Sequence, residues 1–373
     1  MERVKVGVVG CGMISEIYLS NMTTMFSDVL EARACADISQ TAADKRAEQY
    51  GIMTMSVDEL MSDPEIEVVL NLTVPEAHYE IAKKALIAGK HTYSEKPLAI
   101  KFEDGEELIA LAKEKKLLCT AAPDTFLGGG LQACRNLIDE GRIGAPVSAQ
   151  CFMLAWGPEV FHPNPEFLYR DGAGPLYDMG PYYLTALTSI FGPVVKVSGH
   201  AKRTHPDREI LAKNSPRRGE RFPCETETFV SAGLEFESGL IANVILSWDM
   251  TFPYWESDLP LMQVFGSGGT LIMPDPNTFG GVGSTPVGDI GMNVKLRAGA
   301  GDYAEIPVVS DYMGNCRGVG LADMARCIRL GGTPRVSGER ALHVLEIMQS
   351  IIKSSRDEAR HELKTSCARP APM

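Results

Sequence analysis

The sequence predicts an α/β protein of two domains, a parallel-sheet domain followed by an α/β domain with a large, open and mostly antiparallel sheet. Through about residue 125, short β-branched runs alternate with helical stretches, which is the pattern of a parallel sheet with crossover helices. After residue 146 the strand-like runs lengthen and Gly/Pro loops separate them, which indicates antiparallel pairing. Since 373 residues exceed the usual size of one hydrophobic core, we expect one domain over residues 1–125 and a second over 126–373.

Short apolar runs are the expected strands of the first domain. The segments between them carry apolar residues at helical spacing, for example Ile81, Ala82, Ala85 and Leu86. The predicted strands cover Val4–Val9, Leu30–Ala36, Val68–Leu72, Lys90–Ser94 and Leu117–Ala121.

The second domain is predicted from its own strand-like runs and from two other segments. The span from Lys202 to Pro223 is basic and rich in Pro and Gly, which predicts a long exposed loop. An amphipathic helix is expected over residues 339–356, and we expect it to pack back on the first domain. The predicted strands cover Val147–Leu154, Val194–Ala201, Thr228–Phe236, Gly239–Trp248 and Leu261–Gly266.

A glycine-rich turn directly follows the first predicted strand. Gly10 permits a tight strand-to-helix turn, and Gly12 lets backbone N–H groups, including those near Met13 and Ile14, approach a pyrophosphate at a helix N-terminus. Ser15 stands where the third glycine of G-x-G-x-x-G is usual, and it is small enough for close packing of helix and strand. The pattern predicts a Rossmann dinucleotide-binding domain; the alternative is a glycine turn in an α/β domain that binds nothing.

Asp37 ends the second predicted strand, 22 residues after Ser15, where a carboxylate can accept hydrogen bonds from the adenosine ribose hydroxyls. A carboxylate there would repel a 2′-phosphate, and no arginine immediately follows it. Lys45 and Arg46 lie nearby and weigh in the other direction. NAD is therefore the expected cofactor and NADP the less favoured one.

Composition excludes several classes of function. The formal net charge of −12 argues against a nucleic-acid or anionic membrane surface, because clustered Lys and Arg bind such partners. Nine cysteines without C-x-x-C spacing and seven ungrouped histidines predict no metal site and no disulfide framework. No apolar run approaches the roughly 20 residues of a membrane span, and the N-terminus leads straight into a strand, so we expect a cytoplasmic protein.

Two polar clusters follow predicted parallel strands of the first domain, at the edge where open α/β sheets bind ligands. Thr73, Pro75 and His78 follow one strand, and Glu95 and Lys96 follow the next. We expect them to line the cofactor site, with Lys96 also reaching the substrate. The bland alternative is that Lys96 is a surface cation beside a solvent-facing Glu95.

A third cluster lies in the second domain, from Gly172 to Tyr183. Pro181 suits the first turn of a helix, so Asp178 and Tyr182 lie on either side of its beginning. A carboxylate and a phenol at this separation converge if the turn is tight. Alternatively, Tyr182 is a core aromatic and Asp178 is a helix cap.

Aromatic and hydrogen-bonding residues just before this cluster are suited to binding a sugar or glycoside; the alternative is a loop that packs on the sheet. They are Trp156, His162, Tyr169 and Arg170. A further aromatic group suits either a pocket lining or a subunit interface. It comprises Trp248, Phe252, Tyr254 and Trp255.

In this order, these motifs resemble those of the glucose–fructose oxidoreductase/inositol dehydrogenase/MocA (Gfo/Idh/MocA) family. The resemblance covers nearly the whole chain and rests on G-x-G-x-x-S, Thr73-x-Pro75-x-x-His78, Glu95-Lys96-Pro97, Asp178-x-Gly180 and the turn at residues 266–270. It implies a Rossmann domain, an α/β domain with an open sheet, a nicotinamide cofactor that can stay tightly bound, and sugar or polyol substrates.

The chain departs from the family pattern at two places. Many members have D-x-G-x-H-x-x-D, whereas this chain has Tyr182 and Thr185 at the last two positions, which resembles the glucose–fructose oxidoreductase and dihydrodiol dehydrogenase branch. Residues 122–126, Ala-Pro-Asp-Thr-Phe, stand where many members carry an asparagine–arginine pair.

These residues lead to a hypothesis for the chemistry. Oxidation of a hydroxyl requires a base, and a phenol with a pKa near 10 needs a cation beside it to serve. We expect Tyr182 to accept the proton, Lys96 to stabilise the phenolate and donate to the substrate oxygen, and Asp178 to orient both Lys96 and a sugar hydroxyl.

The expected activity is NAD-dependent oxidation of a secondary hydroxyl of a sugar or glycoside, with C3 of a glucoside as the narrower hypothesis. One alternative is a glycosidase that oxidises its substrate transiently and releases the aglycone by elimination. Another is a cofactor-binding regulator without activity. We also expect a homo-oligomer, dimer or higher, because an open sheet leaves one face to be covered.

Overall fold

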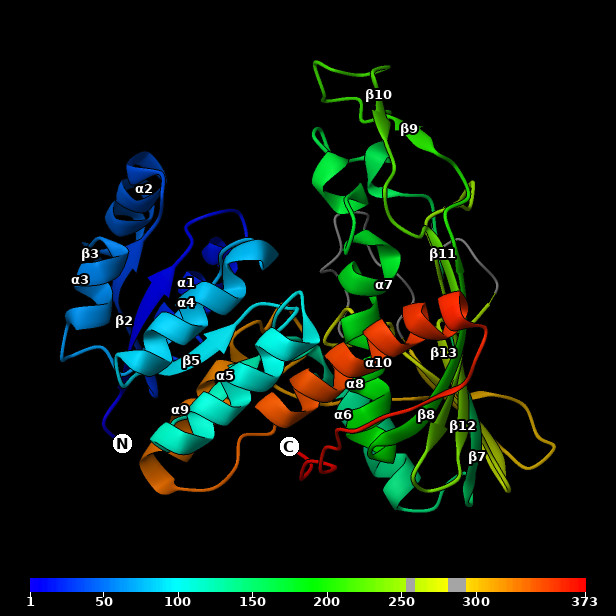
Figure 1. The fold of residues 1–373 in the computed structure, drawn as a ribbon. Coiled ribbons are helices and arrows are strands. Elements are labelled where there is room, and N and C mark those ends of the chain that lie inside the picture. Colours follow the sequence, from blue (N-terminus) through cyan, green and yellow to red (C-terminus); the bar gives the residue numbers. More distant parts are fainter. Residues whose placement is uncertain (253–258, 281–292) are drawn as a thin grey trace. The chain divides into compact units, whose positions relative to one another are not determined.

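The computed structural model describes residues 1–252, 259–280 and 293–373. The chain forms two compact units (Figure 1). Unit 1 comprises Met1–Leu127 and Asn315–Leu345, and unit 2 comprises Gly128–Gly314 and Glu346–Met373. Each unit has its own sheet, and each is described by itself below.

Unit 1 is built on a six-stranded parallel sheet of order β3-β2-β1-β4-β5-β6. The strand order reverses between β1 and β4, and ligands of open α/β sheets bind at the carboxyl ends of the strands beside such a switch point. β4 is buried along its whole length, as expected of a central strand covered on both faces. The strands are β1 (Val4–Val9), β2 (Leu30–Ala36), β3 (Met53–Thr54), β4 (Val68–Asn71), β5 (His91–Ser94) and β6 (Cys119–Ala121).

Local signals in the sequence set the ends of several helices in unit 1. Ser56 and Glu59 form a reciprocal capping box at the start of α3, and Gly51 ends α2 in the left-handed conformation. The helices are α1 (Ser15–Thr23), α2 (Gln40–Tyr50), α3 (Val57–Ser62), α4 (Pro75–Ile87), α5 (Phe102–Lys115), a 3₁₀ turn η1 (Thr125–Leu127), α9 (Val319–Leu330) and the first part of α10 (Gly338–Asp357).

The first part of α10 is part of the unit 1 core. Leu342 is buried in one cluster with Leu98, Phe102 and Leu108. A side chain at Gly105 of α5 would meet Leu342 at 3.0 Å, so the glycine allows the two helices to approach closely. Residues distant in the sequence therefore complete the hydrophobic core beside the parallel sheet.

Unit 2 contains a nine-stranded sheet of order β16-β15-β14-β13-β7-β12-β11-β8-β17. Its pairs are antiparallel except for the parallel pair β7 and β12, among the strands that the structure describes. The strands are β7 (Pro146–Leu154), β8 (Val194–Lys202), β11 (Phe229–Phe236), β12 (Ile241–Ser247), β13 (Met262–Gly266), β14 (Gly269–Met273), β15 (Val294–Ala298), β16 (Ala304–Ile306) and β17 (His361–Glu362).

Strict alternation of buried and half-buried residues along β11 shows that one face of this sheet is covered. α8 is buried at eleven consecutive positions, residues 180–190, and the second part of α10 lies on β8, where Ser354 Oγ accepts a hydrogen bond of 2.9 Å from Gly199 N. The helices of unit 2 are α6 (Gly129–Asp139), α7 (Gly174–Asp178), α8 (Gly180–Phe191) and the 3₁₀ turns η2 (Pro158–Val160) and η3 (Glu166–Tyr169).

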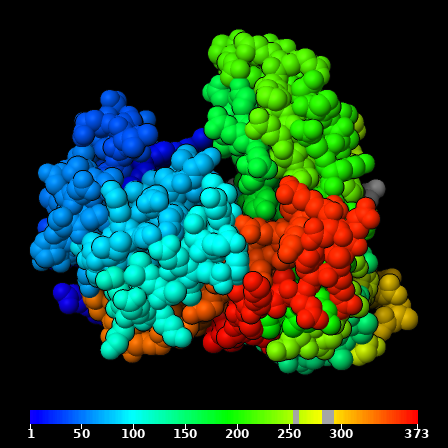
Figure 2. All heavy atoms as spheres, viewed as in Figure 1, coloured from blue at the N-terminus to red at the C-terminus, as the bar shows by residue number. Residues whose placement is uncertain are grey.

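The structure confirms the predicted α/β class, with a parallel sheet followed by a mostly antiparallel one. The segment from Lys202 to Pro223 differs from the predicted exposed loop. It carries the hairpin β9 (Asp207–Glu209) and β10 (Arg221–Pro223), and it projects from unit 2 in the space-filling view (Figure 2). Ile210 and Ala212 are fully buried, so apolar anchors hold this segment against the unit. Tyr254 and Trp255 lie outside the described residues.

Candidate cofactor and substrate site

The glycine loop after β1 combines a closed position and an open one. Gly10 has a φ of +101°, and a Cβ there would lie 2.5 Å from the backbone C and O of Leu72, so only glycine fits. Gly12 is exposed, and a Cβ there would meet no protein atom within 4 Å. The loop therefore presents bare backbone to open space, the cradle that a pyrophosphate requires.

Ser15 and Arg46 support this loop from inside the unit. The Ser15 hydroxyl donates to Gly12 O at 2.6 Å and accepts a hydrogen bond from Arg46 Nε at 3.1 Å. Arg46 also donates to Gly12 O at 3.3 Å and pairs with Glu16 at 3.1 Å, and it is 6% exposed. Its guanidinium is thus bound to the loop, and this weakens the argument that Arg46 would bind the 2′-phosphate of NADP. Ser15, at the third glycine position of the motif, provides the hydroxyl that accepts the hydrogen bond from Arg46.

Asp37 lies at the carboxyl end of β2 beside the glycine loop. Its Oδ2 accepts the backbone N–H of Cys11 at 2.7 Å, and its Oδ1 accepts that of Ser39 at 2.8 Å. These two bonds fix the direction of the carboxylate. The structure therefore brings Asp37 together with the predicted glycine loop.

Two exposed apolar residues near this edge are not among the site residues predicted from the sequence. Ile38 is fully exposed directly after Asp37, and Val74 is 62% exposed after β4, while the predicted residue Met13 is 84% exposed in the glycine loop. Large apolar side chains in water at strand ends suit a flat apolar ligand surface such as adenine. The position of Ile38 directly after Asp37, the predicted ribose-binding residue, is the sequence signal for this residue.

Hydrogen bonds join the loops after β4 and β5. Asn71, at the end of β4, accepts hydrogen bonds through its carboxamide oxygen from the Thr73 hydroxyl at 2.7 Å and through its backbone oxygen from Glu95 N at 2.8 Å. The ring nitrogens of His78 lie 2.7 Å from Pro97 O and 3.0 Å from Thr73 O. His78 is 1% exposed, so it lies behind the predicted cofactor site and supports it.

The Glu95 carboxylate contacts both the interior of unit 1 and the backbone of Lys96. Its Oε1 accepts a hydrogen bond of 2.8 Å from the hydroxyl of Tyr18, which is fully buried, and its Oε2 accepts the backbone N–H of Lys96 at 3.1 Å. Burial and the nearby Glu95 carboxylate raise the pKa of Tyr18. The Glu95 carboxylate is therefore held by the fold and does not simply face solvent, and the contact with Lys96 is made through the backbone N–H of that residue.

Asp124 occupies the segment where the chain departs from the family pattern. It is 2% exposed, and its Oδ2 accepts the backbone N–H groups of Gly318 at 2.9 Å and Gly320 at 3.0 Å, at the start of α9. Burial raises the pKa of this carboxyl to about 6, although the two hydrogen bonds act in the opposite direction. Asp124 thus ties β6 to α9 within unit 1.

Asp178 and Tyr182 lie on either side of the junction between α7 and α8. Met179 ends α7 and precedes α8, and Pro181 stands in the first turn of α8, as predicted. Tyr182 is 7% exposed and its backbone N–H donates to Met179 O at 3.1 Å, while Asp178 is half-buried. Both residues belong to unit 2, whereas Lys96 belongs to unit 1.

The predicted substrate-binding stretch divides by exposure. Trp156 and His162 are half-buried, and Arg170 is exposed. Tyr169 is fully buried, which corrects its prediction as a sugar-contacting residue. Its ring packs on Phe222 and Trp248 with centroids 5.4 Å apart in each case, so the aromatic side chain belongs to the core of unit 2.

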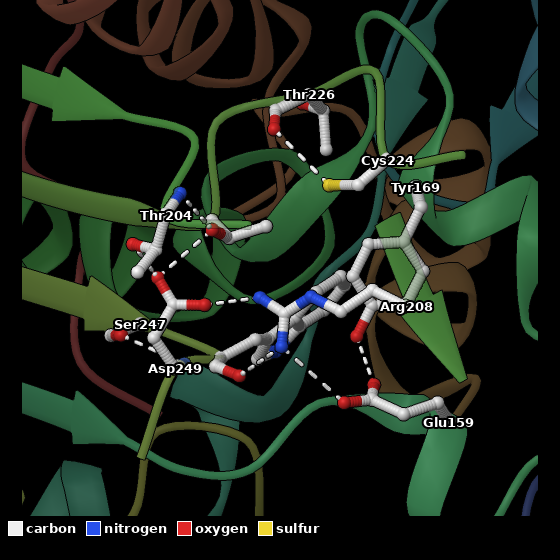
Figure 3. A network of polar contacts seen from close by, with 10 residues as sticks. Glu159, Tyr169, Thr204, Arg208, Cys224, Thr226, Ser247 and Asp249 are labelled. Atoms are coloured by element: carbon white, nitrogen blue, oxygen red, sulfur yellow. Dashed lines mark hydrogen bonds and ion pairs between the residues drawn. The ribbon is translucent and has the colours of Figure 1, made fainter. Parts of the chain in front are cut away.

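A buried ionic network surrounds Tyr169 (Figure 3). Arg208 pairs with Asp249 and lies 3.4 Å from Glu159, and these three side chains are less than 10% exposed. The Tyr169 hydroxyl donates to Glu159, and the Arg208 guanidinium lies 5.4 Å from the Tyr169 ring centroid. The network anchors the projecting segment to the end of β12.

Two further findings concern the described part of the chain. Its His, Cys, Asp and Glu residues form no group of three or more that could hold a metal ion. None of its helices has both the length and the apolar character needed to cross a membrane.

Comparison with known proteins gives the family. The model for the oxidoreductase family with an NAD-binding Rossmann fold matches residues 4–122, and the model for the GFO/IDH/MocA C-terminal domain matches residues 131–272. An uncharacterized oxidoreductase of Schizosaccharomyces pombe is 27% identical over 63% of this chain and 67% of its own length. The 1,5-anhydro-D-fructose reductase of Ensifer adhaerens is 25% identical over 96% of this chain and 98% of its own.

The solved structures agree on the fold. A levoglucosan dehydrogenase in complex with NADH and L-sorbose matches with a TM-score of 0.81 at 18% identity, over 98% of this chain and all of that one. The family models cover residues 4–122 of the parallel-sheet unit and residues 131–272 of the antiparallel-sheet unit, in the order found here. The chain therefore belongs to the GFO/IDH/MocA family and is an NAD-binding oxidoreductase.

Proposed function

We propose that the protein oxidises a secondary hydroxyl of a sugar or glycoside to a ketone, with NAD as the hydride acceptor. The observation that carries the proposal is the pairing of Asp37 with the open glycine loop. Its carboxylate, held by Cys11 N at 2.7 Å, suits the two hydroxyls of an adenosine ribose, and Gly12 leaves room for a pyrophosphate. Arg46 is already bound to Gly12 O and Glu16, which supports NAD over NADP.

We assign the cofactor to residues 1–125, and the substrate to residues 126–373 together with Lys96. Gly10, Gly12, Met13, Ile14 and Asp37 would hold the adenosine and pyrophosphate portions. Thr73, Pro75, Glu95 and Lys96 would line the nicotinamide portion, with His78 behind them. When bound, NAD supplies a carbon that accepts hydride from the carbon bearing the hydroxyl.

In this proposal the proton leaves through side chains of the chain itself. Tyr182 accepts the hydroxyl proton, and Asp178 orients a neighbouring hydroxyl and the Lys96 ammonium. The Lys96 ammonium would stabilise the phenolate that forms when Tyr182 accepts this proton. Lys96 would also donate to the substrate oxygen.

The substrate class is proposed from chemistry and from the relatives. Trp156 and His162 are half-buried and Arg170 is exposed, so aromatic faces and hydrogen-bond donors are available to a sugar ring. One relative is named for 1,5-anhydro-D-fructose, and one structural neighbour for levoglucosan. We propose a glucoside oxidised at C3 as the narrower candidate.

Mass spectrometry of products tests the proposal. The purified protein is incubated with NAD and a panel of free sugars and aryl glucosides, while absorbance at the reduced-nicotinamide band is followed. Loss of two hydrogens from one substrate supports the dehydrogenase. Release of free aglycone would instead support a glycosidase that works by transient oxidation, and NAD binding without any turnover would support a regulator.

We also propose that the protein forms a homo-oligomer through the open sheet of unit 2. Ile241 of β12 is 53% exposed, and Ile245, on the same face of β12, is half-buried and pairs with the half-buried Phe152 of β7. Light scattering coupled to size-exclusion chromatography measures the mass in solution. A mass of 40.5 kDa, that of a single chain, would contradict this part of the proposal.

A further inference from the structure

The imidazole of His78 lies between two carbonyl oxygens of different loops. Nδ1 is 2.7 Å from Pro97 O, in the loop after β5, and Nε2 is 3.0 Å from Thr73 O, in the loop after β4. The backbone oxygen of His78 accepts a further bond of 3.0 Å from the Asn71 side chain. One buried residue near the start of α4 thus contacts both loops of the proposed nicotinamide site.

Hydrogen-bond accounting limits what this ring can do. A carbonyl oxygen only accepts, and a neutral imidazole has one donor nitrogen and one acceptor nitrogen. The neutral ring can therefore satisfy one of the two carbonyls and directs a lone pair at the other. Only the ring with two protons donates to both.

Some groups around His78 oppose protonation of its second ring nitrogen, and others favour it. Burial is the largest effect and holds the pKa of His78 below its ordinary value, and the Lys96 ammonium acts in the same direction. The two carbonyls and the Glu95 carboxylate act in the opposite direction. Glu95 and Lys96 are also the charged groups of the loop that His78 holds, so the charge on the ring and the position of the loop are coupled.

We propose that His78 is a positioning residue that holds the Thr73 loop and the Lys96-Pro97 loop together, and that this tie is complete only when both ring nitrogens carry protons. The proposal rests on the proposed function, because it places NAD and Lys96 at these loops. Nδ1 donates to Pro97 O throughout, since this is the shorter contact. Acidification adds the proton on Nε2 and with it the bond to Thr73 O.

Isothermal titration calorimetry with NAD between pH 4.5 and 7.5 tests the proposal without any sugar, because this range includes values below the ordinary pKa of histidine. His78→Gln replaces the titrating ring with a carboxamide that does not titrate and has one donor nitrogen and one acceptor oxygen. His91→Gln is the matched control, because His91 is a half-buried histidine of unit 1 whose Nδ1 accepts Leu118 N at 2.9 Å. We expect the affinity of the wild type and of His91→Gln to rise as the pH falls through the His78 titration. For His78→Gln we expect no such rise and an affinity about tenfold weaker at the acidic end.

Two results would overturn the inference: the same pH dependence in His78→Gln as in the wild type, or none in the wild type. If His78→Gln does not fold, nitrogen NMR of the wild-type chain labelled at histidine decides. The expected spectrum shows Nδ1 protonated at every pH and Nε2 gaining its proton on acidification, whereas a bare Nε2 throughout would refute the proposal.

The two proposals can fail separately. A wild type that binds NAD with the expected pH dependence but oxidises no sugar would contradict the proposed function alone. A wild type that oxidises a sugar but lacks the His78-dependent pH effect would contradict this inference alone.

Discussion

The carboxylate of Asp37 accepts the backbone N–H of Cys11 at 2.7 Å, and this bond joins the end of β2 to the middle of the glycine loop. It places the Asp37 carboxylate, which we propose for the ribose, and the bare backbone of the loop, which we propose for the pyrophosphate, at one edge of the sheet. The contact is local in space but spans 26 residues of sequence, and the cofactor assignment depends on it.

Asp37→Asn should weaken NAD binding by about 10- to 100-fold, because hydrogen bonds to a charged group contribute about 1.5–3 kcal/mol. Calorimetric titration with NAD measures the change. Asp44→Asn is the control, since Asp44 lies on the exposed face of α2 and bonds to Gln40. Equal affinities in the two variants would contradict the role of Asp37.

Substitutions at the two glycines should affect different properties: stability at Gly10 and NAD affinity at Gly12. Gly10→Ala places a methyl group 2.5 Å from the Leu72 backbone and should lower the melting temperature of the chain. Gly12→Ala meets no protein atom within 4 Å, so it should fold normally and lose NAD affinity. Thermal unfolding and NAD titration of both variants give the comparison. Full NAD affinity in Gly12→Ala would show that nothing approaches this position.

Lys96→Met should lower turnover by orders of magnitude and leave NAD bound, because it removes the charge proposed to stabilise the Tyr182 phenolate. Steady-state kinetics on the sugar found by product analysis, with NAD titration alongside, separates the two effects. Lys101→Met removes an exposed lysine a few residues away and should leave turnover unchanged. Near-normal turnover in Lys96→Met would refute the assignment.

Asp124 should make the stability of the chain depend on pH in the acidic range. The folded pKa of about 6 lies above the ordinary 3.8, so the folded chain binds the proton more tightly than the unfolded chain. Its contribution to stability is fully present below pH 3.8 and falls as the pH rises from about 4 to 6, by about 3 kcal/mol for two pKa units.

Asp124→Asn keeps an acceptor for Gly318 N and Gly320 N but does not titrate. Urea unfolding of the wild type and this variant at several pH values tests the prediction. The stability of the wild type relative to the variant should decrease across that window, and a constant difference would show that the carboxyl has an ordinary pKa.

Arg208→Met should destabilise the chain by about 3–5 kcal/mol, because it leaves the buried carboxylates of Glu159 and Asp249 without their cation (Figure 3). Arg218→Met, at an exposed position of the same projecting segment, should change the stability by less than about 0.5 kcal/mol. Denaturant unfolding compares the two. A small effect of Arg208→Met would mean that solvent reaches the network.

The sequence by itself determined the features that depend on neighbouring residues. Alternating β-branched and helical runs predicted the parallel sheet, with strands Val4–Val9 and Leu30–Ala36 found as expected. The glycine loop, Glu95-Lys96-Pro97 and their positions after strands predicted the family and its cofactor. These signals are readable because backbone propensity and side-chain periodicity act over a few residues.

Only the tertiary structure decided which of these side chains are buried and what they contact. Tyr169 is an aromatic residue of the kind that binds sugars, yet it is buried in the core, where it contacts Glu159 and Arg208. From the sequence, Arg46 could favour NADP, but in the structure its guanidinium donates to Gly12 O. Such contacts join residues tens of positions apart, and their energies depend on burial and charge compensation, which spacing along the chain does not encode.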